Sequence, residues 1–113
     1  MILHYKNETI ECKVKDITYN HKRGTWGNFY TTKLTMVVDN NQYQKILNNK
    51  HNFDFVIQDN NHFQKKCSKI ERLTISSKFK DGTVRITIIA NVFTIKDLEK
   101  NEIRNIRLKQ ILD

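Results

Sequence analysis

The chain has 113 residues and a formal net charge of +8 at pH 7, because 20 Lys and Arg stand against 12 Asp and Glu. A chain of this length is expected to form one domain with a single core, and its hydrophobic residues, 38% of the total, are spread widely enough to exclude wholesale disorder. Its apolar runs are too short for a membrane span or a signal peptide. We therefore expect a soluble, cytoplasmic protein whose basic surface attracts polyanions and has no membrane partner.

Neither a metal site nor a catalytic motif is recognisable in the sequence. Cys12 and Cys67 are far apart, outside any C-x-x-C pair, and the four His add no ligand at zinc-site spacing, so we expect no metal and no cofactor. Cys12 lies between Ile10 and Val14 in an alternating segment, as is typical of a small core residue. A Gly-rich phosphate loop, a nucleophile elbow and motif-placed paired carboxylates are missing, and the sequence predicts a protein that is not an enzyme.

Alternation of apolar and polar residues with a period of two is the main structural signal. The alternation changes phase after Val14, which predicts a β-bulge near Asp16. Residues 42–49 instead have apolar side chains at i, i+3 and i+4 and predict a short helix in the middle of the chain. The predicted strands place these side chains inward: Ile10, Cys12 and Val14; Leu34, Met36 and Val38; Phe53, Phe55 and Ile57.

The dipeptide Asp81-Gly82 predicts a two-residue hairpin turn, because Asp-Gly satisfies the positive φ of a type I′ turn. In that register Lys78 lies opposite Arg85 on the outward face, and like charges in this arrangement destabilise a sheet. We interpret Arg72, Lys78 and Arg85 either as phosphate-binding residues or as an ordinary solvated face. The same register predicts four inward cross-strand pairs: Phe79 with Val84, Ser77 with Ile86, Ile75 with Ile88, and Leu73 with Ala90.

From Thr94 the apolar spacing becomes helical, and Thr94 followed by Asp97 resembles a capping box. The sequence therefore predicts a C-terminal helical segment over residues 94–112. Leu108 and Leu112 do not fit its apolar stripe. Either the last turn packs against another part of the protein, or these residues form a strand. Three cations on one side of the helix are candidate partner-binding residues, or a solvated face: Lys100, Arg104 and Arg107.

These elements together predict a mainly β protein with one domain over residues 1–113. Five or six antiparallel strands are expected to curl into a small barrel, OB-like or related, or into a tight sandwich. A short middle helix and the C-terminal helix complete the expected architecture.

Residues 19–30 are the first candidate for a binding site. They combine cations with aromatic side chains, and single-stranded nucleic-acid binders use such rings to stack bases while cations track the phosphates. The alternative is a long hairpin loop whose Trp26 folds back onto the core. The candidate residues of this segment are Lys22, Arg23, Trp26, Phe29 and Tyr30.

The N-terminal third has a strand pattern that resembles a known class of domain. Residues 2–10, read as ILHYKNETI, are followed by Val14 and Ile17, and Lys33-Leu34 closes the next strand. This spacing resembles the start of small β-barrel domains in phage tail-hub and tail-adaptor proteins. The resemblance transfers no functional residue, but it implies a structural or assembly component of a virion or mobile element.

The sequence favours a non-enzymatic β-barrel that binds nucleic acid, single-stranded or without sequence preference, as an accessory subunit of a replication, repair or mobile-element complex. Two alternatives stay open. The first is a structural or assembly component of a phage virion or tail. The second is a phage-encoded inhibitor whose basic face meets an acidic host protein. The expected nucleic-acid contacts are Lys22, Arg23, Trp26, Phe29, Tyr30, Arg72, Lys78 and Arg85.

Overall fold

The fold is taken from a computed structural model that describes residues 1–6, 8–24 and 27–112, without the side chains of residues 15–28. Within these ranges there are six strands and two helices. The strands are β1 (Ile2–Tyr5), β2 (Glu8–Gly24), β3 (Gly27–Val38), β4 (Phe55–Asp59), β5 (His62–Lys78) and β6 (Val84–Asp97). The helices are α1 (Asn40–Asn48) and α2 (Lys100–Leu112).

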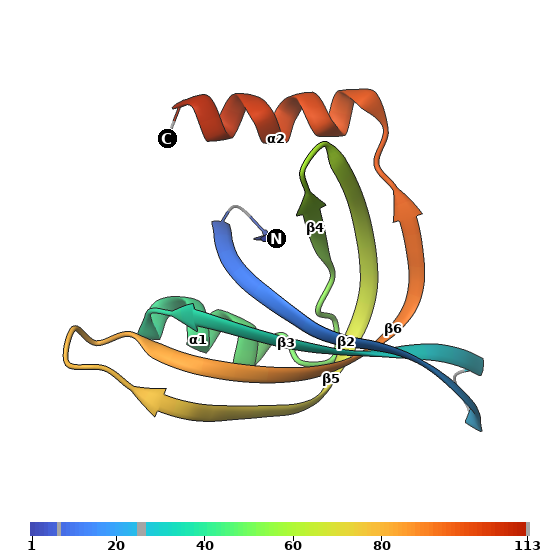
Figure 1. Cartoon of the computed structure of the whole chain (residues 1–113), viewed down its shortest axis with the longest axis horizontal. Helices are drawn as coiled ribbons and strands as arrows, with labels where there is room; N and C mark the ends of the chain where they lie inside the picture. The colour runs from blue at the N-terminus through green and yellow to red at the C-terminus, as the bar shows by residue number, and fades with distance from the viewer. Residues whose placement is uncertain (7, 25–26, 113) are drawn as a thin grey trace.

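The strands close into a barrel in the order β1-β2-β3-β6-β5-β4, with every neighbouring pair antiparallel. In Figure 1, α2 crosses the top of the view above the β4–β5 hairpin, whereas α1 lies at the lower left beside β3. This architecture confirms the predicted mainly β barrel with a middle helix and a C-terminal helix. Neither of these helices is long and apolar enough to cross a membrane.

The core is built from the side chains that the period-two pattern places inward. The sets Leu34, Met36, Val38 and Phe53, Phe55, Ile57 are buried, as are Ile10 and Cys12, while Val14 packs against the core partly buried. The ring of Phe53 lies at the centre of this cluster, with its centroid 5.0 Å from that of Tyr5 and 5.1 Å from that of Phe55. Alternation alone was therefore sufficient to find most of the interior.

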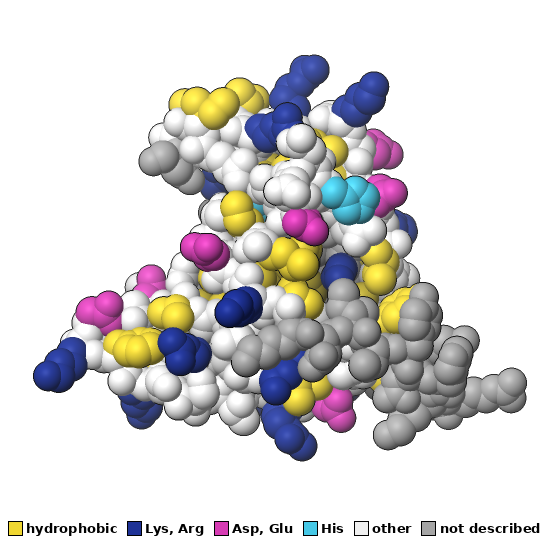
Figure 2. Space-filling view, viewed as in Figure 1, with side chains coloured by type: hydrophobic (Ala, Val, Ile, Leu, Met, Phe, Trp, Pro, Cys, Tyr) yellow, Lys and Arg dark blue, Asp and Glu magenta, His cyan; other side chains and the backbone are white. Residues whose placement is uncertain are grey.

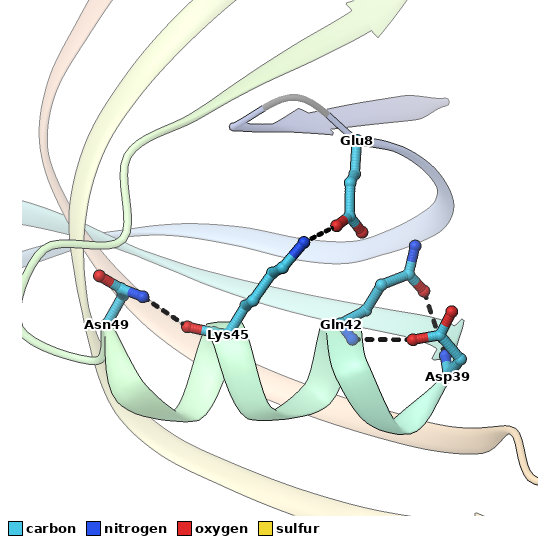
Figure 3. A network of polar contacts seen from close by, with 5 residues as sticks. All are labelled: Glu8, Asp39, Gln42, Lys45 and Asn49. Carbon is cyan, nitrogen blue, oxygen red and sulfur yellow. Dashed lines mark hydrogen bonds and ion pairs between the residues drawn. The ribbon is translucent and has the colours of Figure 1, made fainter. Parts of the chain in front are cut away.

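Helix α1 begins at a complete capping box (Figure 3). The backbone N–H of Gln42 donates to the carboxylate of Asp39 at 2.8 Å, and the N–H of Asp39 donates to the amide oxygen of Gln42 at 3.1 Å. One turn later the ammonium of Lys45 forms an ion pair with Glu8 at the start of β2. Burial of Ile46 then seats the helix against the core.

Strand β2 pairs with two different strands along its length. Residues 8–11 pair with β1, and from Cys12 onward the strand pairs with β3. The register shifts between Val14 and Asp16, so the predicted bulge near Asp16 is confirmed. A bulge increases the local twist of a strand, which helps a strand this long to follow the curve of the barrel.

The shortest seam of the barrel is the pairing of β1 with β4. Leu3 points inward, while the ring of His4 points outward and contacts both neighbouring strands. Nε2 of His4 lies 2.8 Å from the amide oxygen of Gln58 on β4, and Nδ1 lies 3.2 Å from the hydroxyl of Thr9 on β2. An Nε2–H tautomer, which donates to Gln58 and accepts from Thr9, satisfies both contacts.

The β5–β6 hairpin is wider than a two-residue turn. Strand β5 ends at Lys78 and β6 begins at Val84, with the N–H of Phe79 bonded to the carbonyl of Thr83 at 2.9 Å. The carboxylate of Asp81 accepts from both the N–H and the hydroxyl of Thr83, and Gly82 supplies a φ of 90°. These side-chain bonds stabilise a five-residue loop, so the type I′ prediction was wrong.

The predicted register of this hairpin was therefore wrong as well. The observed pairs are Lys78 with Val84, Ser77 with Arg85, Ile75 with Ile86, and Leu73 with Ile88, with bulges in β5 between Ile75 and Ser77 and between Ile70 and Arg72. Lys78 and Arg85 are not cross-strand partners, and the like-charge contact expected between them does not exist. On the inward side Ile86 and Ile88 are buried, but Ile75 is 39% exposed near the tip.

The C-terminal helix starts six residues later than the predicted segment. Residues 94–97 belong to β6, where Thr94 pairs with Cys67 and Asp97 pairs with Gln64. The ladder with β5 holds these residues extended, which overrides the local capping pattern. Helix α2 begins at Lys100 instead.

Phe53→Ala should destabilise the protein by about 3–5 kcal/mol, because it leaves a cavity between two packed rings in the closed core. The measurement is urea unfolding followed by circular dichroism. Val37→Ala, at a position that is 46% exposed on β3, is the matched control and should change stability by less than about 1 kcal/mol. Equal losses in the two variants would contradict the assignment of Phe53 to the centre of the core.

Candidate nucleic-acid interface

Strands β3, β6 and the second half of β5 present a continuous outward surface, here called the outer sheet face. On β3 the buried side chains are Thr32, Leu34, Met36 and Val38, so the residues between them point outward. The same alternation on β6 buries Ile86, Ile88, Ala90 and Val92. The outer sheet face therefore consists of Phe29, Thr31, Lys33, Thr35 and Val37 on β3, Arg85, Thr87, Ile89 and Asn91 on β6, and Arg72 and Thr74 on β5.

Cross-strand register arranges this face in rows. One row runs Lys33, Ile89, Arg72 across β3, β6 and β5, and the next runs Thr35, Thr87, Thr74. Lys13 on β2 extends the threonine row, and the following row places Arg85 between Val37 and Ser77. Because adjacent strands are about 4.8 Å apart, Lys33 and Arg72 lie roughly 10 Å from each other at their backbones.

Hydroxyl groups fill the space between these cations. The side chain of Ser76 donates to the carbonyl of Arg85 at 3.2 Å, and that of Thr74 donates to the carbonyl of Thr87 at 3.5 Å. The hydroxyl of Thr35 is buried and has no hydrogen-bond partner among the described residues. A buried polar group without a partner is costly, so Thr35 is a local cost to the stability of this part of the barrel.

Two phenylalanines form an edge-to-face pair at one end of the outer sheet face. The ring centroids of Phe29 and Phe93 are 6.1 Å apart, with an interplanar angle of 68°, and both side chains are half-buried. Phe93 lies at a β-bulge, where Ser68 and Cys67 pair with Val92 and Thr94. A bulge re-aims the side chain that it carries, and here it brings Phe93 against Phe29.

Sequence reasoning missed Phe93, because Thr94 was interpreted as a helix cap and the preceding residue was left without a role. The inward alternation of Ile86 and Ile88 continues at Ala90 and Val92. Continued by one residue, this pattern would have placed Phe93 on the outward side of the strand. Tyr30, by contrast, follows the alternation of Thr32 and Leu34 to the inward side of β3, so the structure separates it from Phe29.

The basic end of the outer sheet face is the β5–β6 hairpin. The guanidinium of Arg85 lies over the ring of Phe79, 5.5 Å from its centroid. Lys78 is exposed one residue before Phe79, and Figure 2 shows Lys and Arg side chains over this hairpin at the left of the view. Because Lys78 and Arg85 do not face each other, their repulsion is no evidence for a phosphate site. The remaining evidence is the arrangement of cations in the cross-strand rows of the outer sheet face.

A cleft opens beside Arg85, at the point where β2 leaves β3 to pair with β1. Its volume is about 690 Å³, and its walls include Lys13, Thr35, Val37 and Gln42 as well as Arg85. The buried Cys12 and Met36 lie at its base. The cleft combines an apolar lining with the cations Lys13 and Arg85 and the carboxylate of Glu11, and through Thr35, Val37 and Arg85 it adjoins the outer sheet face.

The predicted site residues are thus only partly brought together. Phe29, Arg72 and Arg85 share the outer sheet face, with Lys78 at its hairpin end. Lys22, Arg23 and Trp26 lie outside the residues whose side chains the structure describes. The candidate partner-binding residues are on α2, which Figure 1 shows across the top of the view, away from the β5–β6 hairpin at the lower left: Lys100, Arg104 and Arg107.

Lys66 is a buried cation in β5. Its backbone pairs with Phe55 and Ile95, and its side chain is only 4% exposed. Burial lowers the pKa of its ammonium. Burial likewise raises the pKa of the Cys12 thiol to about 11, with the N-terminal ammonium and, to a smaller extent, the charge of Lys66 opposing that rise.

Groups of three or more His, Cys, Asp or Glu able to hold a metal ion do not occur among the residues that the structure describes. Comparison of the chain with protein-family models, with curated proteins and with solved structures finds no match.

Lys66→Met should stabilise the protein by roughly 1 kcal/mol at neutral pH, because it replaces a buried charge by an apolar side chain of similar length. The unfolded chain binds this proton up to the ordinary lysine pKa of 10.5, whereas the folded chain releases it at lower pH. The charged Lys66 therefore lowers the free energy of unfolding of the wild type most at pH values below its folded-state pKa. This destabilisation decreases as pH rises toward 10.5. Urea unfolding of both proteins, at neutral pH and near pH 10, should show the difference narrowing. A constant difference would place Lys66 in solvent.

Proposed function

We propose that this protein is a non-enzymatic nucleic-acid-binding barrel that acts in the cytoplasm, with single-stranded nucleic acid as its ligand on the outer sheet face. The observation that carries the proposal is the position of the Phe29–Phe93 pair on the same surface as the cation rows of Lys33, Arg72 and Arg85. Sequence-tolerant binders of single strands combine these two parts, rings for the bases and cations for the phosphates.

The spacing of the charged groups supports a strand of nucleic acid as the ligand. Lys33 and Arg72 flank Ile89 in one row, and Arg85 lies two rows further along β6. Cations distributed in two directions over a sheet can meet successive phosphates, whereas a compact anion would need them to converge. Thr87, in the row between them, has a hydroxyl of the kind that donates to phosphate oxygens.

The cleft beside Arg85 supports the same ligand. Its apolar wall at Val37 can accept a base or a ribose, while Lys13 and Arg85 stand at its rim for phosphate. An extended strand would then run from the Phe29–Phe93 pair, over the threonine row, to the cleft.

The test is fluorescence anisotropy with a labelled single-stranded DNA, a duplex of the same sequence and a single-stranded RNA, over a salt series. Binding should be tightest for a single strand and should fall steeply as salt rises, because counterions are released from each neutralised phosphate. Absence of binding at low ionic strength, or equal affinity for the duplex, would contradict the proposal.

Arg72→Gln and Arg85→Gln should each weaken single-strand binding to a similar degree for all sequences. Each should also reduce the slope of log affinity against log salt by about 0.7, the value for one phosphate contact on a single strand. Lys50→Gln, which removes an exposed cation in the connection between α1 and β4, is the matched control. If the control changes the slope as much as the two arginine variants, the binding is diffuse attraction to a basic protein.

Phe29→Leu keeps an apolar side chain against Phe93 but removes the aromatic ring. Loss of one stacking platform should weaken single-strand binding by about 1–3 kcal/mol, with little change in the melting temperature and an unchanged salt slope. Thermal unfolding of the variant controls for folding. Wild-type affinity in this variant would show that Phe29 supports the fold and does not contact bases.

A further inference from the structure

Helix α2 carries an apolar surface that the fold does not use. Over Lys100–Leu112, a segment that the structure describes completely, no side chain is buried. Leu108 is 50% exposed, Ile111 79% and Leu112 84%. Figure 2 shows hydrophobic side chains along the top of the molecule, over α2, with Lys and Arg beside them. Exposed aliphatic groups in this concentration are typical of an interaction surface.

The opposite side of α2 holds the helix to the barrel. Ile106 is half-buried there, and Ile103 is half-buried at the border between this side and the outward one. The side-chain amide of Gln110 donates to the amide oxygen of Gln58 at 3.0 Å, and the guanidinium of Arg107 donates to Asn61 at 3.2 Å and lies 5.8 Å from the ring centroid of Phe63. These contacts set the rotation of α2 about its axis, so that Leu108 and Ile111 point away from the barrel.

The surface directed outward has both shape and charge. A hollow of about 290 Å³ lies between the side chains of one helix side, with Leu108 and Ile111 as its apolar walls. Its cationic rim comes from residues at i, i+4 and i+7 of the same helix. We call this surface the α2 outer face; it consists of Lys100, Ile103, Arg104, Arg107, Leu108 and Ile111.

We propose that the α2 outer face docks an acidic amphipathic helix of another protein. The hollow has the size to take a large apolar side chain of the partner, as in helix-in-groove recognition. Carboxylates of the partner would meet Lys100 and Arg104, while the guanidinium of Arg107 contacts Asn61 and Phe63 at the edge of the surface, so the charge of the surface selects an acidic partner. This inference is independent of nucleic-acid binding, because it uses none of the residues of the outer sheet face.

Two other occupants fit these observations less well. A second copy of the chain carries the same net charge of +8 and would place Arg104 against like charge. An anionic lipid surface would accept the cations and the aliphatic groups, but it has no side chain to fill a hollow. Helices that lie in a membrane interface also commonly carry Trp or Phe, and residues 100–112 contain no aromatic residue.

The test uses the full chain and a synthetic peptide of designed sequence, with Leu at i, i+3, i+4 and i+7 and Glu on both flanks. A peptide of the same composition in scrambled order is the control ligand. Fluorescence anisotropy should show that the amphipathic peptide binds at least about 10-fold tighter than the scrambled one, which corresponds to about 1.4 kcal/mol. Equal affinity for the two peptides would overturn the proposal.

Three variants locate the contact. The double variant Leu108→Ser, Ile111→Ser should lose at least about 10-fold in peptide affinity while keeping its melting temperature, because both side chains are exposed. Arg104→Glu should weaken binding of the Glu peptide and strengthen binding of a version in which Lys replaces Glu. Ile75→Ser, at a comparably exposed aliphatic residue on the β5–β6 hairpin, is the matched control and should bind as the parent does.

Two further measurements test the other two occupants, a second copy of the chain and a lipid surface. Sedimentation equilibrium should find the parent monomeric, and a dimer that the double variant abolishes would assign the face to a second copy. Co-sedimentation with vesicles of phosphatidylglycerol should not depend on Leu108 and Ile111. Dependence on those residues, combined with no preference between the peptides, would assign the face to a lipid surface and overturn the proposal.

Discussion

The fold depends on the pairing of one four-residue strand with both of its neighbours. Strand β1 is the piece that joins β2 to β4, and without it the sheet would have two open edges, which invite pairing with other chains. Leu3 and Tyr5 anchor β1 in the core, and the imidazole of His4 connects Thr9 to Gln58 on the outside. Closure curves the sheet, and that curvature gives β3 and β6 the outward surface on which the proposed ligand lies.

Closure of the barrel also determines where the charged side chains lie. With apolar residues inside, most of the described cations lie on the outside, and two groups of them are on the outer sheet face and on α2. Lys66 is the exception, held in the wall of the barrel between Phe55 and Ile95. The two proposed surfaces are on different elements, α2 at the top of Figure 1 and the strands below it, so a nucleic acid and a protein partner would not compete for the same residues.

Period-two alternation predicted the barrel, most of its core and the bulge near Asp16, because burial on one side of a strand is recorded locally in the sequence. The strand register and the ends of the strands and helices were harder to predict from the sequence. The side chain of Asp81 bonds to Thr83 and widens a turn that Asp-Gly alone predicts to be tight. Likewise, pairing with β5 keeps residues 94–97 extended against their helical spacing. For the site, Phe29 was found from composition, but its contact with Phe93 joins strands far apart in the chain and depends on a bulge that no local pattern predicts.

The absence of buried side chains along Lys100–Leu112 has a consequence for the motions of the protein. Little free energy is lost when α2 opens, so its amide hydrogens can exchange with solvent through local opening, while those of β3 and β6 wait for global unfolding. The helix and the barrel are then separate cooperative units of one chain. A partner that covers Leu108 and Ile111 would slow exchange in α2 alone, and cleavage near Leu98 would release the helix and leave the barrel closed.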